Sequence, residues 1–309
     1  MLPTRSTCIT IQGPPGPPGK TYYPLHRTTL HIPPLGPTSV LIRLTAASLN
    51  HRDLFIRQNL YPRISFHTPL LADGCGIVIG TGSSPATKRW AGKRVVLTPG
   101  YGWASSPDGP EDEGGYRILG GTATVPLGTL QEYAVVEAGE VEEVPGHLSD
   151  VEAAALPLTG LTAWRALFTK CAGHVGAGKN VLVTGVGGGV ALMVVLFAVG
   201  VGANVFEHGG IISLYGMTTS PSLTLSMPTV LKNIEIRTTT MGSRAEFAAM
   251  LAFVRTHKLR PVISRVVKGL DVDKIDGLFE DMKAGRQFGK LVVEIAGEGE
   301  RERDGGSRL

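Results

Sequence analysis

The stretch Val181-Leu-Val-Thr-Gly-Val-Gly-Gly-Gly-Val-Ala-Leu-Met-Val-Val-Leu-Phe-Ala198 decides the fold of this chain. Residues 180–184 are apolar enough to predict a buried strand, and residues 190–199 predict a helix that is apolar on all sides. The glycines between them allow a tight turn in which backbone N–H groups approach a pyrophosphate at the N-terminus of the helix. This order of strand, turn and helix indicates a nucleotide-binding unit, with a glycine turn that binds no ligand as the alternative.

The residues of this turn are the first candidates for cofactor contacts. They are Gly185, Gly187, Gly188, Gly189 and Val190. Val190 stands where the third glycine of the usual pattern lies, so we expect looser packing of helix against strand there. Residues 181–206 carry no charge and are long enough to span a membrane, but the glycines that interrupt them favour a strand and a buried helix instead. We therefore expect no membrane segment.

Length and composition narrow the class of protein further. The chain has 309 residues, of which 42% are hydrophobic and 18% charged, so it can build real cores and is long enough for two domains. Its net charge of +4 is mild and does not indicate binding to nucleic acid. Three widely spaced cysteines speak against a disulfide scaffold and a structural zinc, and are typical of a reducing compartment.

The two halves of the chain have different patterns. Residues 1–148 alternate β-rich runs with loops rich in glycine and proline, which predicts an irregular β domain. A capping box formed by Ser149 and Glu152 then starts an alternation of helices and strands. We expect helices at residues 161–168, 190–199, 244–257 and 273–283, and strands at residues 180–184, 211–215, 234–240 and 290–295.

One connection in the second half is too short. Residues 202–206 resemble the second strand of a dinucleotide-binding unit, yet only four residues separate them from the strand expected at 211–215. Parallel neighbours need a crossover of ten or more residues, so either the two segments form an antiparallel hairpin or one is not a strand. We hypothesise that about 50–60 residues, roughly two βαβ units' worth, are absent. Glu207, at the spacing of a ribose-binding acid, would then be only a junction residue.

Seven motifs together resemble one family. They are AASLNHRDLFIRQNLYP (46–62), GCGIV (74–78), GTLQEYAV (128–135), LPLTGLTAW (156–164), VLVTGVGGG (181–189), GGIISLYG (209–216) and GRQFGKLVV (285–293). The chain resembles the medium-chain dehydrogenase/reductase superfamily, and within it the zinc-free, quinone-oxidoreductase-like branch. The resemblance implies an α/β fold with a GroES-like β domain (1–148 and 262–296) and a Rossmann-type coenzyme domain (149–261) truncated near 206–208. Residues 297–309 would be a disordered tail.

The resemblance also bears on a metal. Zinc-dependent relatives place a cysteine at the position of Asn50, a histidine at that of Ala72 and a glutamate at that of Asp73. An amide and a methyl group are poor zinc ligands, and residues 99–121 lack the cysteines of the relatives' structural zinc lobe. His51 and His67 are isolated and are more typical of solvated histidines. We therefore expect no metal.

Without a metal, the chemistry would depend on the cofactor and on positioning. In the reductases that the chain resembles, the spacing N-x-x-D-x-x-x-R-x-x-x-Y lines the cleft, which gives Asn50, Asp53, Arg57 and Tyr61 as candidate catalytic residues. Tyr61 would donate a proton or a hydrogen bond, and Asn50 would orient the nicotinamide or a carbonyl. The alternatives are a helical ion pair between Asp53 and Arg57 and a packing role for Tyr61.

The resemblance supplies further cofactor contacts and a function. Thr159, Tyr215, Gly216 and Met217 would lie on the nicotinamide side, and Lys290 near the cleft between the domains. The cofactor would be NADP(H), with NAD(H) as the alternative, and the substrate a small quinone or α,β-unsaturated carbonyl. The rival hypotheses are a truncated, catalytically impaired isoform and an enoyl-thioester reductase.

Location and assembly complete the expectations. The family often forms dimers through an edge strand of the coenzyme domain, and residues 234–240 retain this edge, so the resemblance is compatible with a homodimer without deciding the oligomeric state. We expect the protein in the cytoplasm. The alternative is the peroxisome, because the terminal Ser307-Arg308-Leu309 is similar to the S-K-L address.

Overall fold

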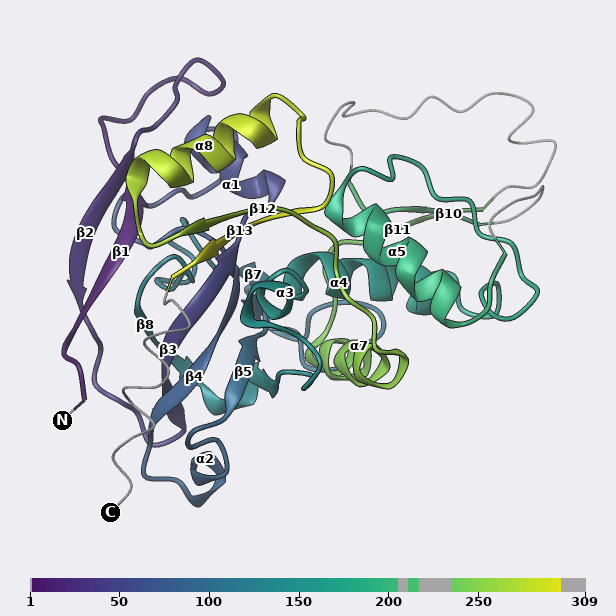
Figure 1. Ribbon diagram of the computed structural model, residues 1–309, viewed down its shortest axis with the longest axis horizontal. Helices are drawn as coiled ribbons and strands as arrows, with labels where there is room; N and C mark the ends of the chain where they lie inside the picture. The colour runs from purple at the N-terminus through teal and green to yellow at the C-terminus, as the bar shows by residue number, and fades with distance from the viewer. Residues whose placement is uncertain (1, 205–210, 217–234, 296–309) are drawn as a thin grey trace.

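The computed structural model describes residues 2–204, 211–216 and 235–295 (Figure 1). Its largest sheet has seven strands in the order β12-β13-β3-β4-β5-β9, with β8 also paired to β3. Within this sheet of the described residues, β12 and β13 are the one parallel pair, and the other neighbouring strands are antiparallel. The strands are β3 (Ser39–Ser48), β4 (Asp73–Thr81), β5 (Arg94–Leu97), β8 (Tyr133–Glu137), β9 (Val141–Glu143), β12 (Ile263–Lys268) and β13 (Lys290–Glu294).

β3 is the central strand of this sheet, and all ten of its residues are buried. The sequence of β3 is a nearly continuous run of apolar and small residues, as expected for a strand covered on both faces. β13 pairs with the end of β3, where Val292 lies opposite Ser48. The last described strand of the chain is thereby built into a sheet made mostly from the first half.

A second β layer and two helices cover one side of the sheet. The antiparallel pair β1 (Arg5–Ile11) and β2 (Leu25–His31) packs with α1 (His51–Arg57) and α8 (Val272–Lys283) around a shared apolar core. The smaller elements of this half are β6 (Gly100–Tyr101), β7 (Arg117–Ile118), α2 (Pro85–Lys88) and a 3-10 turn, Ala138–Glu140.

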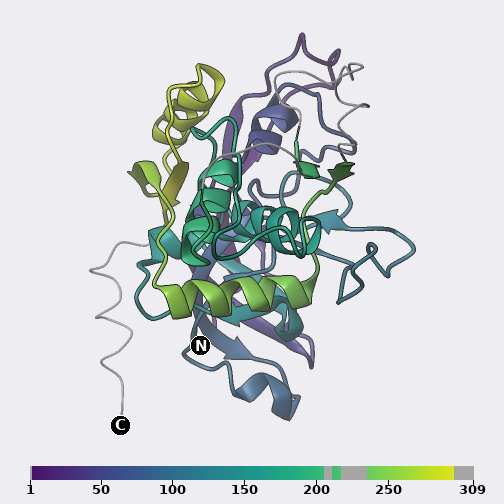
Figure 2. The same cartoon turned by 90° about the vertical axis from the view of Figure 1, so that its right-hand side faces the viewer.

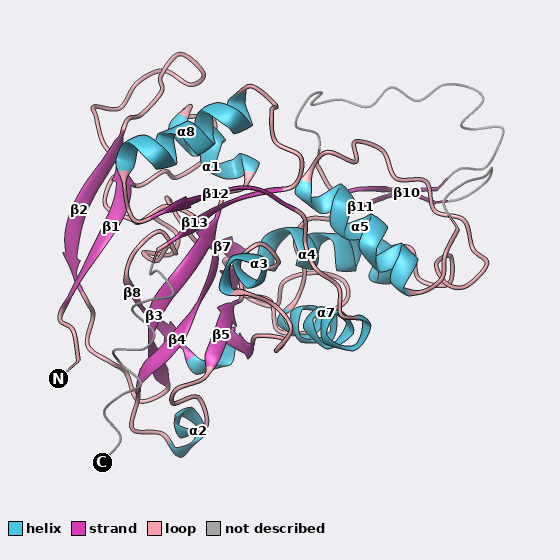
Figure 3. Ribbon diagram, viewed as in Figure 1, coloured by secondary structure: helices cyan, strands magenta, loops and turns pink. Residues whose placement is uncertain are grey.

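The other half of the molecule is helical (Figure 3). Its helices are α3 (Asp150–Ala154), α4 (Pro157–Trp164), which continues as a π-helical turn (Arg165–Thr169), α5 (Gly189–Gly200) and α7 (Arg244–His257). α4 packs against both α5 and α7, and Figure 2 shows the light-green α7 crossing in front of the teal helices. A short parallel pair, β10 (Ile211–Leu214) and β11 (Glu235–Thr238), lies beside this layer.

Aromatic rings hold the helical layer together. Trp164 of α4, Phe197 of α5 and Phe253 of α7 contact one another with ring centroids 5.4–5.8 Å apart. Phe168, on the π-helical turn, joins the same cluster, which we call the aromatic cluster. Such edge and tilted contacts stabilise beyond the burial of area alone.

Most of the helices expected from the sequence are confirmed. α5 and α7 follow the expected bounds closely, and α7 begins with a capping box in which Ser243 accepts from the backbone of Glu246. The capping box at Ser149 is also confirmed. In the part of the chain that the structure describes, no helix is long and apolar enough to cross a membrane. Glu207, Met217 and residues 297–309, including Ser307-Arg308-Leu309, lie outside the described residues.

The expected buried strand at residues 180–184 is wrong. Asn180 makes a single parallel bridge to Asn204, and the following residues are irregular. The side chain of Leu182 is 70% exposed. An apolar segment becomes a buried strand only where neighbours pair with it and cover it, and the described residues supply just that one bridge. The alternatives for residues 202–215 depend on residues 205–210, which lie outside the described residues. In the described part, Asn204 bridges to Asn180 and β10 pairs with β11.

Replacing Phe197 by alanine tests the role of the aromatic cluster. Phe197 is fully buried, so Phe197→Ala should lower the free energy of unfolding by about 3–5 kcal/mol. Urea titration followed by circular dichroism measures this loss. Phe288→Ala is the matched control, because Phe288 is 57% exposed and its truncation should change stability by no more than about 0.5 kcal/mol. Equal losses in the two variants would contradict this account of the helical layer.

Candidate active site

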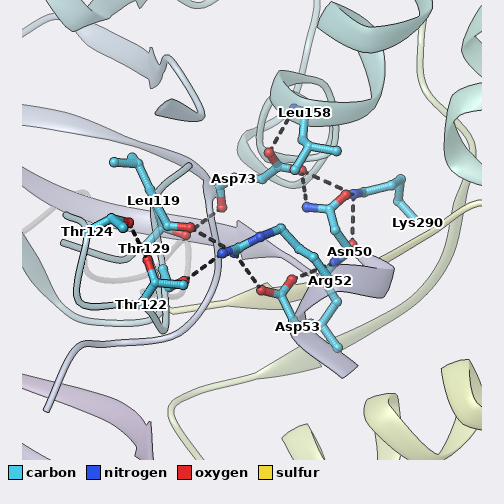
Figure 4. A network of polar contacts seen from close by, with 12 residues as sticks. Asn50, Arg52, Asp53, Asp73, Leu119, Thr122, Thr124, Thr129, Leu158 and Lys290 are labelled. Carbon is cyan, nitrogen blue, oxygen red and sulfur yellow. Dashed lines mark hydrogen bonds and ion pairs between the residues drawn. The ribbon is translucent and has the colours of Figure 1, made fainter. Parts of the chain in front are cut away.

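A buried polar cluster lies where the sheet meets the helical half (Figure 4). Asn50 precedes α1, while Asp73 and Lys290 are the first residues of β4 and β13. The register brings them together, because Ser48 of β3 lies opposite both Asp73 and Val292. Asn50 follows that end of β3 by two residues. Strand pairing, rather than nearness in sequence, therefore builds the cluster.

The ammonium group of Lys290 lies at the centre of this cluster. Its Nζ donates to the carbonyl of Leu49 at 2.8 Å, to Asn50 Oδ1 at 2.7 Å and to Asp73 Oδ2 at 3.1 Å. An ammonium has three N–H donors, so these three acceptors use all of them. The Lys290 side chain is 4% exposed and that of Asp73 is fully buried. Lys290 and Asp73 thus form an ion pair shielded from water.

Asp73 also connects the cluster to the helical half. Its Oδ1 accepts from the backbone N–H of Leu158, in the first turn of α4, at 2.8 Å. Its Oδ2 accepts from Asn50 Nδ2 at 2.9 Å, and its carbonyl accepts from Thr129 Oγ1 at 2.8 Å. The two carboxylate oxygens therefore face three N–H donors from three separate segments. The sequence led only to a comparison of Asp73 with a zinc ligand, and this role was missed. The one feature of the sequence that could have indicated it is an acidic residue directly after the apolar run at residues 70–72.

Asp53 orients the start of α1. Its Oδ2 accepts from the backbone N–H of Asn50 at 2.8 Å, and its Oδ1 lies 3.2 Å from Nη1 of Arg52. Arg52 also donates to the carbonyls of Leu119 and Gly120. Burial raises the pKa of Asp53 to about 6, although the charge of Arg52 opposes the shift. The alternative role of Asp53 and Arg57, an ion pair along the helix, is wrong, because Asp53 pairs with Arg52 and Arg57 pairs with Asp276.

Arg57 and Tyr61 lie apart from the Lys290 cluster. Arg57 Nη1 lies 2.6 Å from Asp276 Oδ1 of α8, and its Nε donates to the carbonyl of Tyr23. Its guanidinium stacks on Tyr22, with 4.2 Å to the ring centroid. These contacts make Arg57 a link between α1 and α8. The ring of the half-buried Tyr61 lies under the guanidinium of Arg52, at 4.7 Å. Of the four candidate catalytic residues, Asn50 and Asp53 are therefore in direct contact with each other, and Tyr61 is joined to them through Arg52.

The glycine turn lies next to the Lys290 cluster. Gly185 has a φ of +66°, which favours glycine, and residues 185–187 are exposed. A Cβ on Gly189 would lie 2.9 Å from Thr159 Cγ2 and 3.0 Å from Lys290 Cδ, so the turn is packed directly on Thr159 and Lys290. The first N–H groups of α5 have no partner within the helix. An exposed turn before a twelve-residue helix fits the pyrophosphate of a dinucleotide.

The remaining cofactor candidates lie at the end of β10. Tyr215 follows this strand and is half-buried, and burial raises the pKa of Tyr215. Gly216 is exposed, with open space where a Cβ would stand. β10 packs against the π-helical turn that follows α4. Val190 is half-buried at the start of α5, and Met217 lies outside the described residues.

The donor set of the cluster does not fit zinc. Ala72 offers no donor, and Asn50 and Asp73 offer oxygens that already accept from Lys290. Zinc in proteins prefers the sulfur of cysteine and the nitrogen of histidine along with carboxylates. Across residues 2–204, 211–216 and 235–295, the structure contains no group of three or more His, Cys, Asp and Glu side chains arranged to hold a metal ion.

The structure thus combines a β-rich half with a helical half, and a buried polar cluster lies beside the glycine turn that precedes α5. Residues 36–146 match the alcohol dehydrogenase GroES-like domain family. The zinc-type alcohol dehydrogenase-like protein YogA of Leptosphaeria maculans is 43% identical over 345 residues, covering 90% of this chain and 96% of that protein. The chain belongs to the medium-chain dehydrogenase/reductase superfamily, a class of oxidoreductases.

Two other similar proteins extend this comparison. The crotonyl-CoA reductase of Streptomyces collinus is 30% identical over 203 residues, covering 58% of this chain and 44% of that protein. The solved structure of the crotonyl-CoA carboxylase/reductase AntE in complex with NADP has a TM-score of 0.78 at 15% identity, covering 96% of both chains. This structural likeness shows that the fold is shared.

The raised pKa of Asp53 predicts a pH effect on stability. Between about pH 4 and 6 the folded state keeps the proton that an unfolded aspartate has lost, so the contribution of Asp53 to stability falls as pH rises. The free energy of unfolding of the native chain minus that of Asp53→Asn should therefore fall across this range, by up to about 1.4 kcal/mol per pH unit. Urea titrations at several pH values measure it.

Asp271→Asn is the control with the opposite sign. A hydrogen bond from the backbone N–H of Lys274 lowers the pKa of Asp271. The free energy of unfolding of the native chain minus that of Asp271→Asn should therefore rise with pH, at pH values below the ordinary pKa of an aspartate. A flat or rising difference for Asp53→Asn would contradict the assigned burial effect.

Proposed function

We propose that this chain is a zinc-free, NADPH-dependent reductase of quinones or α,β-unsaturated carbonyl compounds. The observation that carries the proposal is the packing of Gly189 on Lys290, because it sets the nucleotide turn beside a polar cluster whose donors do not fit zinc. A cofactor held on the turn would extend toward this cluster. When bound, NADPH would supply the hydride, and the protein would supply binding, orientation and a proton.

Separate groups of this chain would perform these tasks. The turn and the N-terminus of α5 would bind the diphosphate, with the buried Thr159 fixing the approach. Asn50 Nδ2 uses one N–H on Asp73, which leaves a second to orient a carbonyl or carboxamide. Lys290 has no N–H left to donate, so it is not the acid. Tyr61, whose ring Arg52 covers, would donate the proton or hydrogen-bond the substrate oxygen.

The choice of NADPH rests on likeness rather than on a contact in this chain. AntE shares the fold and was solved with NADP. The residue that would distinguish NADP from NAD by spacing, Glu207, lies outside the described residues. NAD(H) is therefore the alternative cofactor. The partial identity with crotonyl-CoA reductase favours an enoyl thioester as the second candidate substrate class.

The competing proposal is an impaired isoform that has lost part of its coenzyme domain. The alignment with YogA runs over 345 residues, more than the 309 of this chain, so that relative has positions without a counterpart here. The exposed Leu182 and the single bridge from Asn180 to Asn204 also support a loss near residues 206–208. A smaller sheet would weaken the site for the adenosine part of the cofactor.

Two measurements separate these proposals. Purified protein incubated with NADPH and a panel of quinones, enones and enoyl thioesters should oxidise NADPH, followed at 340 nm, at a rate that a strong chelator leaves unchanged. Fluorescence titration with NADPH should give a micromolar dissociation constant. Absence of binding would favour the impaired isoform, whereas binding without turnover on any acceptor would contradict the proposed reaction alone.

A pair of tyrosine variants tests the proton donor. Tyr61→Phe removes only a hydroxyl and should lower kcat by about 10²-fold or more with little change in KM. Tyr22→Phe is the matched control, because Tyr22 stacks on Arg57 away from the cluster and should keep the native kcat. An unchanged kcat in Tyr61→Phe would assign Tyr61 to packing instead.

A further inference from the structure

We propose that Lys290 is a built-in cation that replaces a metal ion at this site, neutralising Asp73 and fixing the amide of Asn50. The structural part of this inference stands on the contacts of Lys290, and only its effect on turnover rests on the proposed reductase function. Lys290 acts through Asn50 and is therefore a positioning residue.

The geometry of the three acceptors matches an ammonium rather than a metal. The oxygens of Leu49, Asn50 and Asp73 lie 2.7–3.1 Å from Lys290 Nζ, which is the range of N–H···O hydrogen bonds. Oxygen ligands of Mg²⁺ or Ca²⁺ lie at about 2.0–2.6 Å, and zinc prefers nitrogen and sulfur ligands. A metal ion would have to displace Nζ, and the buried ammonium would then lose all of its acceptors.

The charge of Lys290 is required because Asp73 is buried. A carboxylate without exposure to water is costly unless a cation and hydrogen bonds compensate it. In the part of the chain that the structure describes, the ion pair of Asp73 is with Lys290. The N–H groups of Leu158 and Asn50 supply the remaining bonds. Removing only the ammonium would leave a buried negative charge next to the amide that we assign to the substrate or nicotinamide.

The strand end that carries Lys290 also contacts the glycine turn. The N–H of Gly289 donates to the carbonyl of Gly187 at 3.1 Å, and the N–H of Lys290 donates to the carbonyl of Val262 at 2.9 Å. Gly289 has a φ of +100°, and a Cβ there would lie 2.4 Å from the Val262 oxygen, so only glycine fits. The stem of Lys290 packs on Gly189. One short segment thus holds both the nucleotide turn and the Asn50 amide in a fixed relation.

A double-mutant cycle on stability tests the charge pairing without relying on activity. Lys290→Met and Asp73→Asn should each lower the urea midpoint of unfolding, because each leaves one buried charge without its partner. The double variant Lys290→Met/Asp73→Asn should recover much of the loss and lie closer to the native chain than either single variant. Additive losses, or a double variant that does not fold, would overturn the proposal.

The exposed pair Lys93 and Glu143 provides the matched control cycle. Their charged atoms are 3.3 Å apart, close to the distance in the buried pair, but both side chains are about half exposed. Lys93→Met, Glu143→Gln and their combination should shift the urea midpoint little and almost additively. A coupling in this pair as large as in the buried one would show that burial is not the cause.

Metal binding and turnover supply two independent measurements. Native protein dialysed against Zn²⁺ or Mn²⁺ should retain no stoichiometric metal. If the native protein retains one metal ion per chain and Asp73→Asn does not, the proposal is overturned. If the reductase activity is present, Lys290→Met should lower kcat by about 10²-fold with a smaller change in KM, because Asn50 is misplaced. Lys290→Ala should lose activity in the same way, and added ethylammonium should restore part of its kcat by replacing the missing ammonium group. A native kcat in Lys290→Met would also overturn the assignment. If the native chain shows no reductase activity, only the proposed function is refuted. The double-mutant cycle and the metal measurement then still decide whether Lys290 replaces a metal ion.

Discussion

The ion pair between Lys290 and Asp73 is the constraint on which the arrangement of the site depends. Two opposite charges lie where water does not reach, and each is tolerated only because the other is present. The pair joins the start of β13 to the start of β4, and a further hydrogen bond ties Asp73 to the first turn of α4. These contacts join the sheet to the first turn of α4 at a place that also borders the glycine turn.

Local patterns in the sequence were sufficient for the helices. α7 begins and ends at the expected residues because its apolar positions recur at helical spacing and Ser243 and Glu246 form a capping box. The α/β fold class also followed, since the change from β-rich runs to a strand and helix alternation is a property of short windows. Placing Lys290 near the cleft between the domains required the family resemblance, because nothing within ten residues of Lys290 in sequence indicates Asn50 or Asp73.

The misjudged features are those that depend on partners distant in sequence. Residues 180–184 have the composition of a buried strand, but composition cannot tell whether neighbouring strands exist to cover it. Arg57 has a carboxylate four residues before it on the same helix, yet it pairs with Asp276, more than two hundred residues away. Long-range pairing of this kind is decided by the packing of α1 on α8. The same reason explains why the sequence led only to a comparison of Asp73 with a glutamate of the zinc-dependent relatives, and not to its pairing with Lys290.

The aromatic cluster has a consequence for how the helical half responds to mutation. Because the rings of α4, α5 and α7 pack on one another, each of these helices helps to hold the other two. A substitution that removes one large ring therefore disturbs three helices at once, although they are far apart in sequence.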